Sequence, residues 1–478
     1  NNSWSFTTQL TQIFLNLNFE EISISRIILF ISTFFYSTGV YLISKNISSS
    51  RLLAIFIVFF VMIFRKNFGN IDYPTLMFSE HTNGMISLSV ASMIFGLICN
   101  KNFFLSTFFI GILISIHLTV GLWILFLFLI SYLYYNFNEK IKLPKKSFIF
   151  GFSLGLFISL ISFYYFQNNQ IKIPYELMSN SYDNYMKNWD AHRNSYGSLA
   201  FLNYSYVFKS FILFLILLVY SKFLSNKENY HLKFFSIFLI LNIFISFVLY
   251  VTYKKAPFLY PDILIRTIPT RFFLMHSVIG YPIIISSFYL LFINLTQKFN
   301  IYPKTILTVF ASLILFYSAS HYKNINSLSQ NFLFNLNEQN KLNKNSFWKE
   351  VKKLKTTGYI VTSELACSST ITKANKPVII CPHPIDYIPY LPKLSGKIEL
   401  VMREIYEYSF SSPPPKTNEI LDGLRDNAIK KIFEKKSSQD WIKIKNNFIV
   451  EGVIAPSNWS LNLEPLIIKE NYTFYKIP

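Results

Sequence analysis

Long runs of apolar residues recur along the first two thirds of the chain, and they constrain its fold more than any other feature. A helix that crosses a bilayer core needs about 20 apolar residues, and 52% of this chain is hydrophobic, with a mean hydropathy of +0.34. The pattern therefore predicts a polytopic α-helical membrane protein with about ten apolar helices. Their expected ranges are 24–44, 51–64, 84–99, 103–116, 118–135, 147–166, 206–225, 235–253, 272–294 and 304–320.

The second to fourth segments are shorter than a bilayer requires, which predicts tilted, re-entrant or broken helices. The run from Phe108 to Ile130 also carries His117, Thr119 and Gly121 at its middle. We expect two helices here, broken at His117 and Gly121. His117 then either faces a wet cavity inside the bundle or satisfies backbone carbonyls that the break leaves free.

The charges of the loops predict the orientation of these helices. Alternate loops, beginning with "KNISSSR", hold twelve Lys and Arg residues within 42 positions, whereas the opposite loops at 65–83, 167–205 and 254–271 hold nine within 76. Because cytoplasmic loops carry the excess of Lys and Arg, the denser set is expected in the cytoplasm. Residues 1–22 and everything after Ser320 are then expected outside, on the outer face of the cytoplasmic membrane.

After residue 320 the composition changes to that of a soluble domain. "FWKEVKKLK" predicts a helix, "GYIVTS" a strand, "LACSSTITKAN" a helix or loop and "KPVIIC" a second strand, and an alternating pattern continues to the end. The chain is thus expected to comprise an outer segment at 1–22, a transmembrane helical domain at 23–320 and an extracytoplasmic α/β domain at 321–478. Cys367 and Cys381 form either a disulfide or two buried free thiols.

The formal net charge of +20 does not indicate nucleic-acid binding. No soluble segment interleaves a basic stripe with aromatic residues, and lysine greatly outnumbers arginine. The chain also contains no Walker loop, GxGxxG, HExxH, GxSxG or CxxC motif. Nucleotide-driven transport and thiolate metal chemistry therefore lack their usual signatures.

Four places hold polar residues that a bilayer would normally exclude. Carboxylates beside a cavity can act as a general base or hold a divalent metal, and arginine binds phosphate through two parallel hydrogen bonds. Aromatic residues beside polar ones suit a sugar, although they are equally expected as an interfacial belt. The candidate residues are Asp72, Glu80 and His81 in the first place, His117 in the second, Asp190, His192 and Arg193 in the third, and Lys254, Lys255, Arg266 and Arg271 in the fourth, which also contains Asp262 and His276.

The order of these features resembles the GT-C superfamily of membrane glycosyltransferases. The resemblance covers most of the chain and rests on "GMISLSVASMIFGLICNKNFFLSTFFIGILISIHLTVGLW", on "IPTRFF" before a late helix, and on an outer C-terminal α/β domain. Leu118 stands where relatives frequently have proline. The resemblance implies a polyprenyl-phosphate sugar donor and a catalytic acid in the first outer loop. Most of that loop would lie upstream of Asn1, with residues 1–22 as its tail.

We therefore expect a glycosyltransferase in which Asp72, Glu80 or a preceding acid deprotonates the acceptor, which is a glycan, a lipid or a protein. Arg266 and Arg271 would hold the lipid phosphate. One alternative is a transporter or polymerase-like handler of lipid or polysaccharide without transferase chemistry, because broken helices and a midplane histidine are also features of transporters. A membrane scaffold that binds through its outer domain is a third class.

Overall fold

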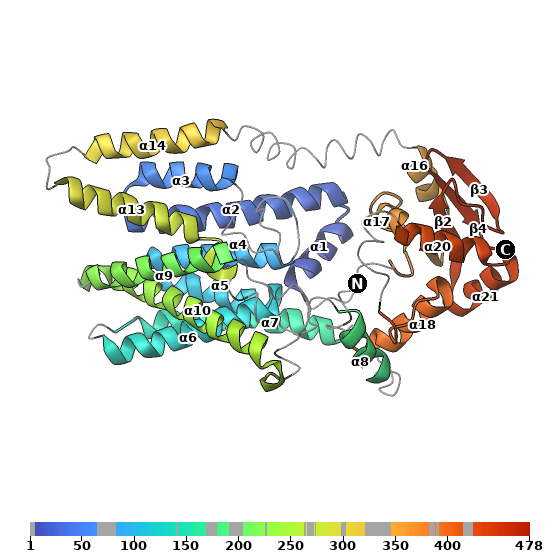
Figure 1. The fold of residues 1–478 in the computed structure, drawn as a ribbon, viewed down its shortest axis with the longest axis horizontal. Coiled ribbons are helices and arrows are strands. Elements are labelled where there is room, and N and C mark those ends of the chain that lie inside the picture. Colours follow the sequence, from blue (N-terminus) through green and yellow to red (C-terminus); the bar gives the residue numbers. More distant parts are fainter. Residues whose placement is uncertain are drawn as a thin grey trace. The chain divides into compact units, whose positions relative to one another are not determined.

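The computed structural model describes residues 5–64, 83–139, 142–168, 179–190, 204–224, 227–261, 274–297, 303–320, 346–381, 392–413 and 424–478, with the single positions 264, 272 and 388. The chain forms two compact units (Figure 1). The first unit comprises Asn1–Gln170 and Ser198–Asn335, and the second comprises Ile171–Gly197 and Leu336–Pro478. Residues Ile171–Gly197 come from the sequence between two apolar helices of the first unit, where we expected an outer loop.

The first unit is helical, and each of the ten predicted apolar segments contains a helix. Its elements are α1 (Phe6–Asn16), α2 (Glu21–Ser48), α3 (Arg51–Phe64), α4 (Asn83–Cys99), α5 (Phe103–Ile116), α6 (Leu118–Asn138), α7 (Lys145–Asn168), α9 (Tyr204–Phe223), the 3-10 turn η3 (Lys227–Asn229), α10 (Tyr230–Lys255), the 3-10 turn η4 (Pro257–Leu259), α12 (Leu274–Ser277), α13 (Gly280–Gln297) and α14 (Pro303–Ser320). The segment predicted at 272–294 is thus divided into α12 and α13. Pro282 lies in the first turn of α13, where its missing N–H would have no partner within the helix.

Within the described residues, four helices are long and apolar enough to cross a membrane. They cover Ser23–Ser48, Leu118–Asn138, Lys145–Gln167 and Tyr230–Tyr253. Shorter apolar helices accompany them at Arg51–Ile63, Asn83–Cys99, Phe103–Ile116, Gly280–Leu295 and Thr305–Tyr317. A mostly helical chain with several apolar helices indicates a membrane-associated protein. The ten membrane crossings stay a prediction.

Small residues bring the helices of the first unit close together. A Cβ atom on Gly39 of α2 would collide with the carbonyl of Ser92 in α4, and one on Gly155 of α7 would collide with the carbonyl of Phe108 in α5. Ser159 of α7 also donates a hydrogen bond of 2.6 Å to the carbonyl of Gly111 in α5. Helices pack in this way inside membranes, where lipid supplies no hydrophobic force between them.

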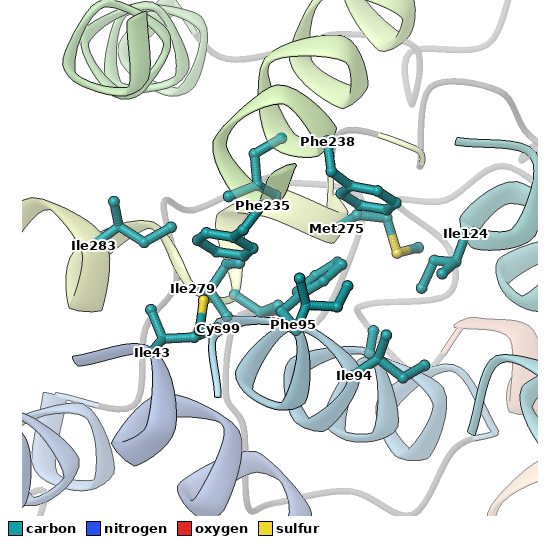
Figure 2. Packing of buried hydrophobic residues seen from close by; sticks show 14 of the residues in the cluster. Ile43, Ile94, Phe95, Cys99, Ile124, Phe235, Phe238, Met275, Ile279 and Ile283 are labelled. Carbon is teal, nitrogen blue, oxygen red and sulfur yellow. The ribbon is translucent and has the colours of Figure 1, made fainter. Parts of the chain in front are cut away.

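Aromatic side chains fill the interior of this bundle. The ring of Phe95 in α4 lies 5.4 Å from that of Phe238 and 6.3 Å from that of Phe235, both in α10. Figure 2 shows these rings with Ile43 of α2 and Met275 of α12 around them. Elements that are distant in the sequence therefore share one apolar core.

The second unit contains a four-stranded sheet in the order β1-β2-β4-β3. β1 pairs with β2 in parallel, and β2 with β4 and β4 with β3 are antiparallel pairs. Its elements are α8 (Ser179–Asn188), α16 (Ser346–Lys353), β1 (Tyr359–Thr362), α17 (Glu364–Thr372), the 3-10 turn η7 (Pro392–Leu394), α18 (Ser395–Tyr406), α20 (Leu424–Lys435), α21 (Ser438–Phe448), β2 (Val450–Pro456), β3 (Glu464–Lys469) and β4 (Tyr472–Lys476). This sheet and its helices agree with the predicted α/β pattern.

The prediction of a full strand at "KPVIIC" is wrong. It forms only an isolated parallel bridge between Val378 and Ile360 of β1. Two backbone hydrogen bonds hold it, from the N–H of Ile360 to the carbonyl of Pro377 and from the N–H of Ile379 to the carbonyl of Ile360. Pro377 has no N–H with which to extend the ladder.

Candidate functional site

Seven of the predicted site residues lie outside the residues that the structure describes. These are Asp72, Glu80, His81, His192, Arg193, Arg266 and Arg271. Of the remaining four, His117, Lys254 and Lys255 belong to the first unit and Asp190 to the second. Lys254 and Lys255 end α10, where Lys255 is exposed.

His117 forms the break between α5 and α6, which confirms the position of the break that the sequence predicted. Its extended backbone, with φ −151° and ψ 100°, ends one helix and begins the next. Its N–H donates to the carbonyl of Leu113 at 2.9 Å, and its Nδ1 accepts from the N–H of Val120 at 3.4 Å. The imidazole therefore caps the N-terminus of α6, so that a neutral ring carries its proton on Nε2.

Gly121 does not break a helix, contrary to the prediction, since it lies within the first turn of α6. A Cβ atom there would lie 2.6 Å from both the Cα and the backbone nitrogen of Ile114 in α5. The glycine allows α6 to fold back closely against α5 directly after the single extended residue. His117 and Gly121 thus serve one sharp turn between two apolar helices.

Polar side chains at the N-termini of α1 and α4 contact this turn through Ser5, and we call Ser5, Thr7, Asn83 and His117 the polar junction. Thr7 Oγ1 donates to Asn83 Oδ1 at 2.8 Å, and Ser5 Oγ lies 2.7 Å from Thr7 Oγ1 and 3.3 Å from the carbonyl oxygen of Ile116. Ser5 is buried. Since Asn83 begins α4, the junction directly follows residues 65–82 in the chain, the stretch that carries Asp72, Glu80 and His81.

A second polar group lies inside the bundle, where four side chains from α6, α9, α10 and α12 form a buried network. Trp123 Nε1 donates to Asn242 Oδ1 at 3.0 Å. Asn242 Nδ2 lies 3.1 Å from His276 Nδ1, and His276 Nε2 lies 2.9 Å from Ser210 Oγ. All four side chains are less than a tenth exposed.

The network determines the tautomer of His276. Because an indole N–H can only donate, the amide oxygen of Asn242 must face Trp123 and the amide nitrogen must face His276. His276 Nδ1 then accepts, so the ring proton lies on Nε2 and is donated to Ser210 Oγ. His276 is therefore a neutral residue that joins four helices.

Trp123 of this network also contacts a residue just before α12. The ring of Phe272, which follows Arg271 in the sequence, stacks on Trp123 at 4.0 Å with an interplanar angle of 4°. Trp123 is six residues along α6 from His117, about 9 Å along the helix axis. His117 of the polar junction and the ring contact between Trp123 and Phe272 are therefore both placed by the first half of α6.

Asp190 belongs to the second unit, where it lies two residues after the end of α8. It is 2% exposed, and its N–H donates to the carbonyl of Tyr185 at 3.0 Å. Next to it, Trp189 Nε1 lies 2.7 Å from the carbonyl oxygen of Ser412, and the ring of Trp189 lies 5.4 Å from that of Phe410. These contacts give Asp190 a fixed position within the second unit.

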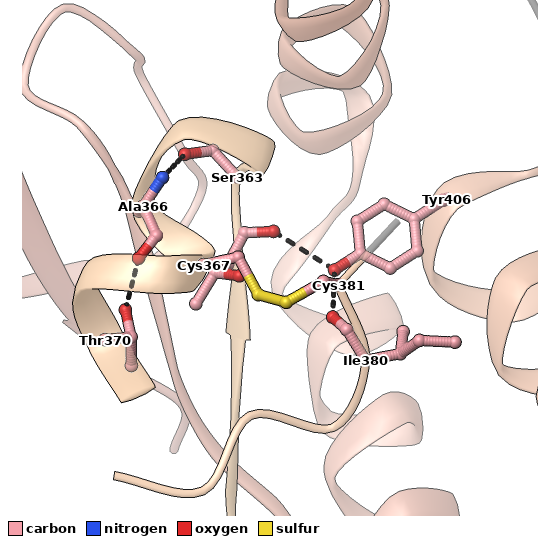
Figure 3. Close-up of a disulfide and its surroundings, with 8 residues drawn as sticks. Ser363, Ala366, Cys367, Thr370, Ile380, Cys381 and Tyr406 are labelled. Atoms are coloured by element: carbon pink, nitrogen blue, oxygen red, sulfur yellow. Dashed lines mark hydrogen bonds between the residues drawn. A yellow bond between two sulfur atoms is a disulfide. The ribbon is translucent and has the colours of Figure 1, made fainter. Parts of the chain in front are cut away.

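Cys367 and Cys381 form a disulfide, which decides between the two alternatives that the sequence left open. Their Cα atoms are 5.8 Å apart. Figure 3 shows Tyr406 of α18 beside this bond, with its hydroxyl 3.0 Å from the carbonyl oxygen of Thr362 and 3.4 Å from that of Ile380. Tyr406 thus joins the end of β1 to the segment that forms the isolated bridge, and the disulfide joins that segment to α17.

Sequence reasoning missed Trp123, Asn242 and Ser210. A signal for Asn242 was present, because an amide in the middle of the apolar run 235–253 is unusual in a span and requires partners. Among the described residues, no three His, Cys, Asp or Glu side chains are grouped to hold a metal ion. In comparisons with known proteins, no family model, curated protein or solved structure matched the chain.

Proposed function

We propose that the protein is a membrane glycosyltransferase of the GT-C type. It would transfer a glycosyl group from a polyprenyl-phosphate donor to a glycan, lipid or protein acceptor at the outer face of the cytoplasmic membrane. The observation that carries the proposal is the helix break at His117, which gathers α1, α4, α5 and α6 in the polar junction. A group of polar side chains at the edge of an apolar bundle, where Asn83 is exposed and His117 is half-buried, suits a reaction on a substrate held in lipid.

Three features of the chain support the proposed site. The junction directly follows the stretch with Asp72, Glu80 and His81, which supplies candidate bases. Phe272, which follows Arg271 in the sequence, stacks on Trp123, and Trp123 belongs to the same helix α6 that His117 caps. Lys254 and Lys255 add positive charge at the end of α10, which suits an anionic lipid carrier.

The proposed reaction needs a base and charge stabilisation. The carboxylate of Asp72 or Glu80 takes the proton of the acceptor hydroxyl, whose oxygen bonds to the anomeric carbon of the donor sugar. The bond from that carbon to the phosphate oxygen breaks, and its electron pair leaves with the polyprenyl phosphate. Arg266 and Arg271 stabilise the departing phosphate, while His81 and His117 bind the substrates.

The test uses the full-length protein in nanodiscs that contain extracted polyprenyl-phosphate and polyprenyl-phosphate-sugar lipids. Native mass spectrometry compares the wild type with the double variant Arg266→Ala, Arg271→Ala. The matched control, Lys45→Ala with Lys222→Ala, removes two positive charges from the last turns of α2 and α9. Adding membrane-extracted acceptors then shows whether bound donor is converted to free polyprenyl phosphate.

The proposal predicts a retained lipid whose mass includes a sugar, its loss in the double arginine variant and its retention in the control. Conversion of this lipid on addition of acceptor supports transfer. Retention without conversion favours a transporter or another lipid handler. Equal retention by both double variants removes the arginines from the mechanism.

A further inference from the structure

A groove of about 400 Å³ opens on the side of the first unit, away from the polar junction. It lies between α6 and α7, with Thr107 and Ile110 of α5 at its base. Its lining is almost wholly apolar, and its volume is in the range of small-molecule sites. The groove therefore offers space for a hydrocarbon chain.

Close packing on one side of α5 accounts for the opening. Gly151 and Gly155 allow α7 to approach α5 closely, because neither has a Cβ atom that would collide with α5. On the other side of the turn at His117, α6 also packs on α5. Aromatic side chains bridge α6 and α7, since the ring of Phe148 lies 5.1 Å from that of Phe128 and 5.2 Å from that of Tyr132. These rings give the groove rigid walls.

The groove has charge at only one place. Lys145, in the first turn of α7, lines it, and Lys142 and Lys146 are exposed nearby in the chain. Within the described parts of the chain, the ion pairs do not include Lys145. This end of the bundle also carries the loops whose charge predicts the cytoplasmic side.

We infer that the groove binds an acidic phospholipid, with an acyl chain between α6 and α7 and the headgroup phosphate at Lys145. A bilayer supplies both parts of this ligand. Basic pockets between membrane helices on the cytoplasmic side hold anionic headgroups, and Lys145 provides that charge at the mouth of an apolar groove. This site is independent of the proposed transferase site.

The test titrates the delipidated full-length protein with phosphatidylglycerol or phosphatidylcholine and counts bound lipids by native mass spectrometry. Lys145→Gln removes the charge of the groove, and Lys222→Gln removes an exposed charge in the last turn of α9 as its control. Ile149→Trp fills the groove from its open rim, where Ile149 is 67% exposed. Ile161→Trp is its control, on an exposed position of α7 outside the groove.

We expect phosphatidylglycerol to bind more tightly than phosphatidylcholine. Lys145→Gln should weaken its binding roughly fivefold, Ile149→Trp should abolish the tight site for both lipids, and neither control should change it. Equal binding of the two lipids, equal effects of the two lysine variants, or an unchanged site in Ile149→Trp would each overturn the inference. Unfolding temperatures of all four variants verify that each is folded.

Discussion

Both units have an apolar core, but most of the exposed large apolar side chains, and the buried amide and imidazole of one hydrogen-bonded network, belong to the first unit. Asn242 and His276 are fully buried in the first unit, while Phe137 is 85% exposed. In the second unit Trp348 and Trp441 are at most 2% exposed. Because isolated exposed apolar residues are ordinary but a surface full of them is not, the difference indicates that the two units face different solvents.

The two units also depend on different devices to stay folded. The first uses small residues at helix crossings and hydrogen bonds between helices, as at Gly155 and Asn242. The second uses the hydrogen bonds of a β-sheet and a disulfide. A substitution that removes one device should therefore act on one unit and leave the other unit folded.

The largest effect is expected from Gly155→Leu in α7. The new side chain would collide with the carbonyl of Phe108, a backbone atom that cannot move without displacing α5. We expect the first unit to lose more than about 3 kcal/mol of stability, measured as thermal unfolding in detergent. Ser153→Leu, at an exposed position on the same helix, is the control. Equal unfolding of the two variants would contradict the close crossing.

The next effect concerns α8, which the sequence places between two membrane helices. Tyr185 is 2% exposed, and its ring lies 5.2 Å from that of Phe410 in the core of the second unit. Tyr185→Ala should destabilise the second unit by about 3 kcal/mol. Urea unfolding monitored by limited proteolysis measures this loss. Asp183→Ala, two residues away on the exposed face of the same helix, should have no effect. Destabilisation of the first unit alone would show that α8 belongs there.

A smaller effect is expected from Asn242→Leu. This change leaves Trp123 Nε1 and His276 Nδ1 buried without their partner, which costs about 2 kcal/mol. Ser236→Ala is the control, because the Ser236 hydroxyl bonds only to the carbonyl of Leu232 in its own helix. Thermal unfolding in detergent should separate the two variants, and identical values would mean that the network does not hold the helices together.

The smallest effect is a pH dependence confined to the second unit. Hydrogen bonds from the hydroxyl and N–H of Thr357 and from the N–H of Gly358 lower the pKa of Glu451 below its ordinary value of 4.5. The stabilisation is therefore complete above that value and is lost as the pH falls through the lowered pKa. The stability difference between wild type and Glu451→Gln should shrink on acidification below about pH 5. A difference that grows on acidification would contradict this assignment.

The sequence allowed the helices to be predicted because long apolar runs are a local signal, and the break at His117 followed from a histidine, a threonine and a glycine in one such run. Pairings between distant residues were not predictable in this way. Asn242 and His276 are 34 positions apart, and their contact depends on how α10 and α12 pack. In the same way, the spacing of Cys367 and Cys381 did not decide whether they form a disulfide, because sequence separation does not determine the distance between two Cα atoms.

The most direct test of the account is the side of the membrane on which each part lies. In a Cys99→Ala background, one variant carries Asn458→Cys on the exposed surface of the second unit, and another carries Lys142→Cys beside the groove. Intact bacterial cells are treated with a membrane-impermeant maleimide, with and without permeabilisation. We expect labelling of Asn458→Cys in intact cells and of Lys142→Cys only after permeabilisation. The reverse pattern, or labelling of both positions in intact cells, would contradict it.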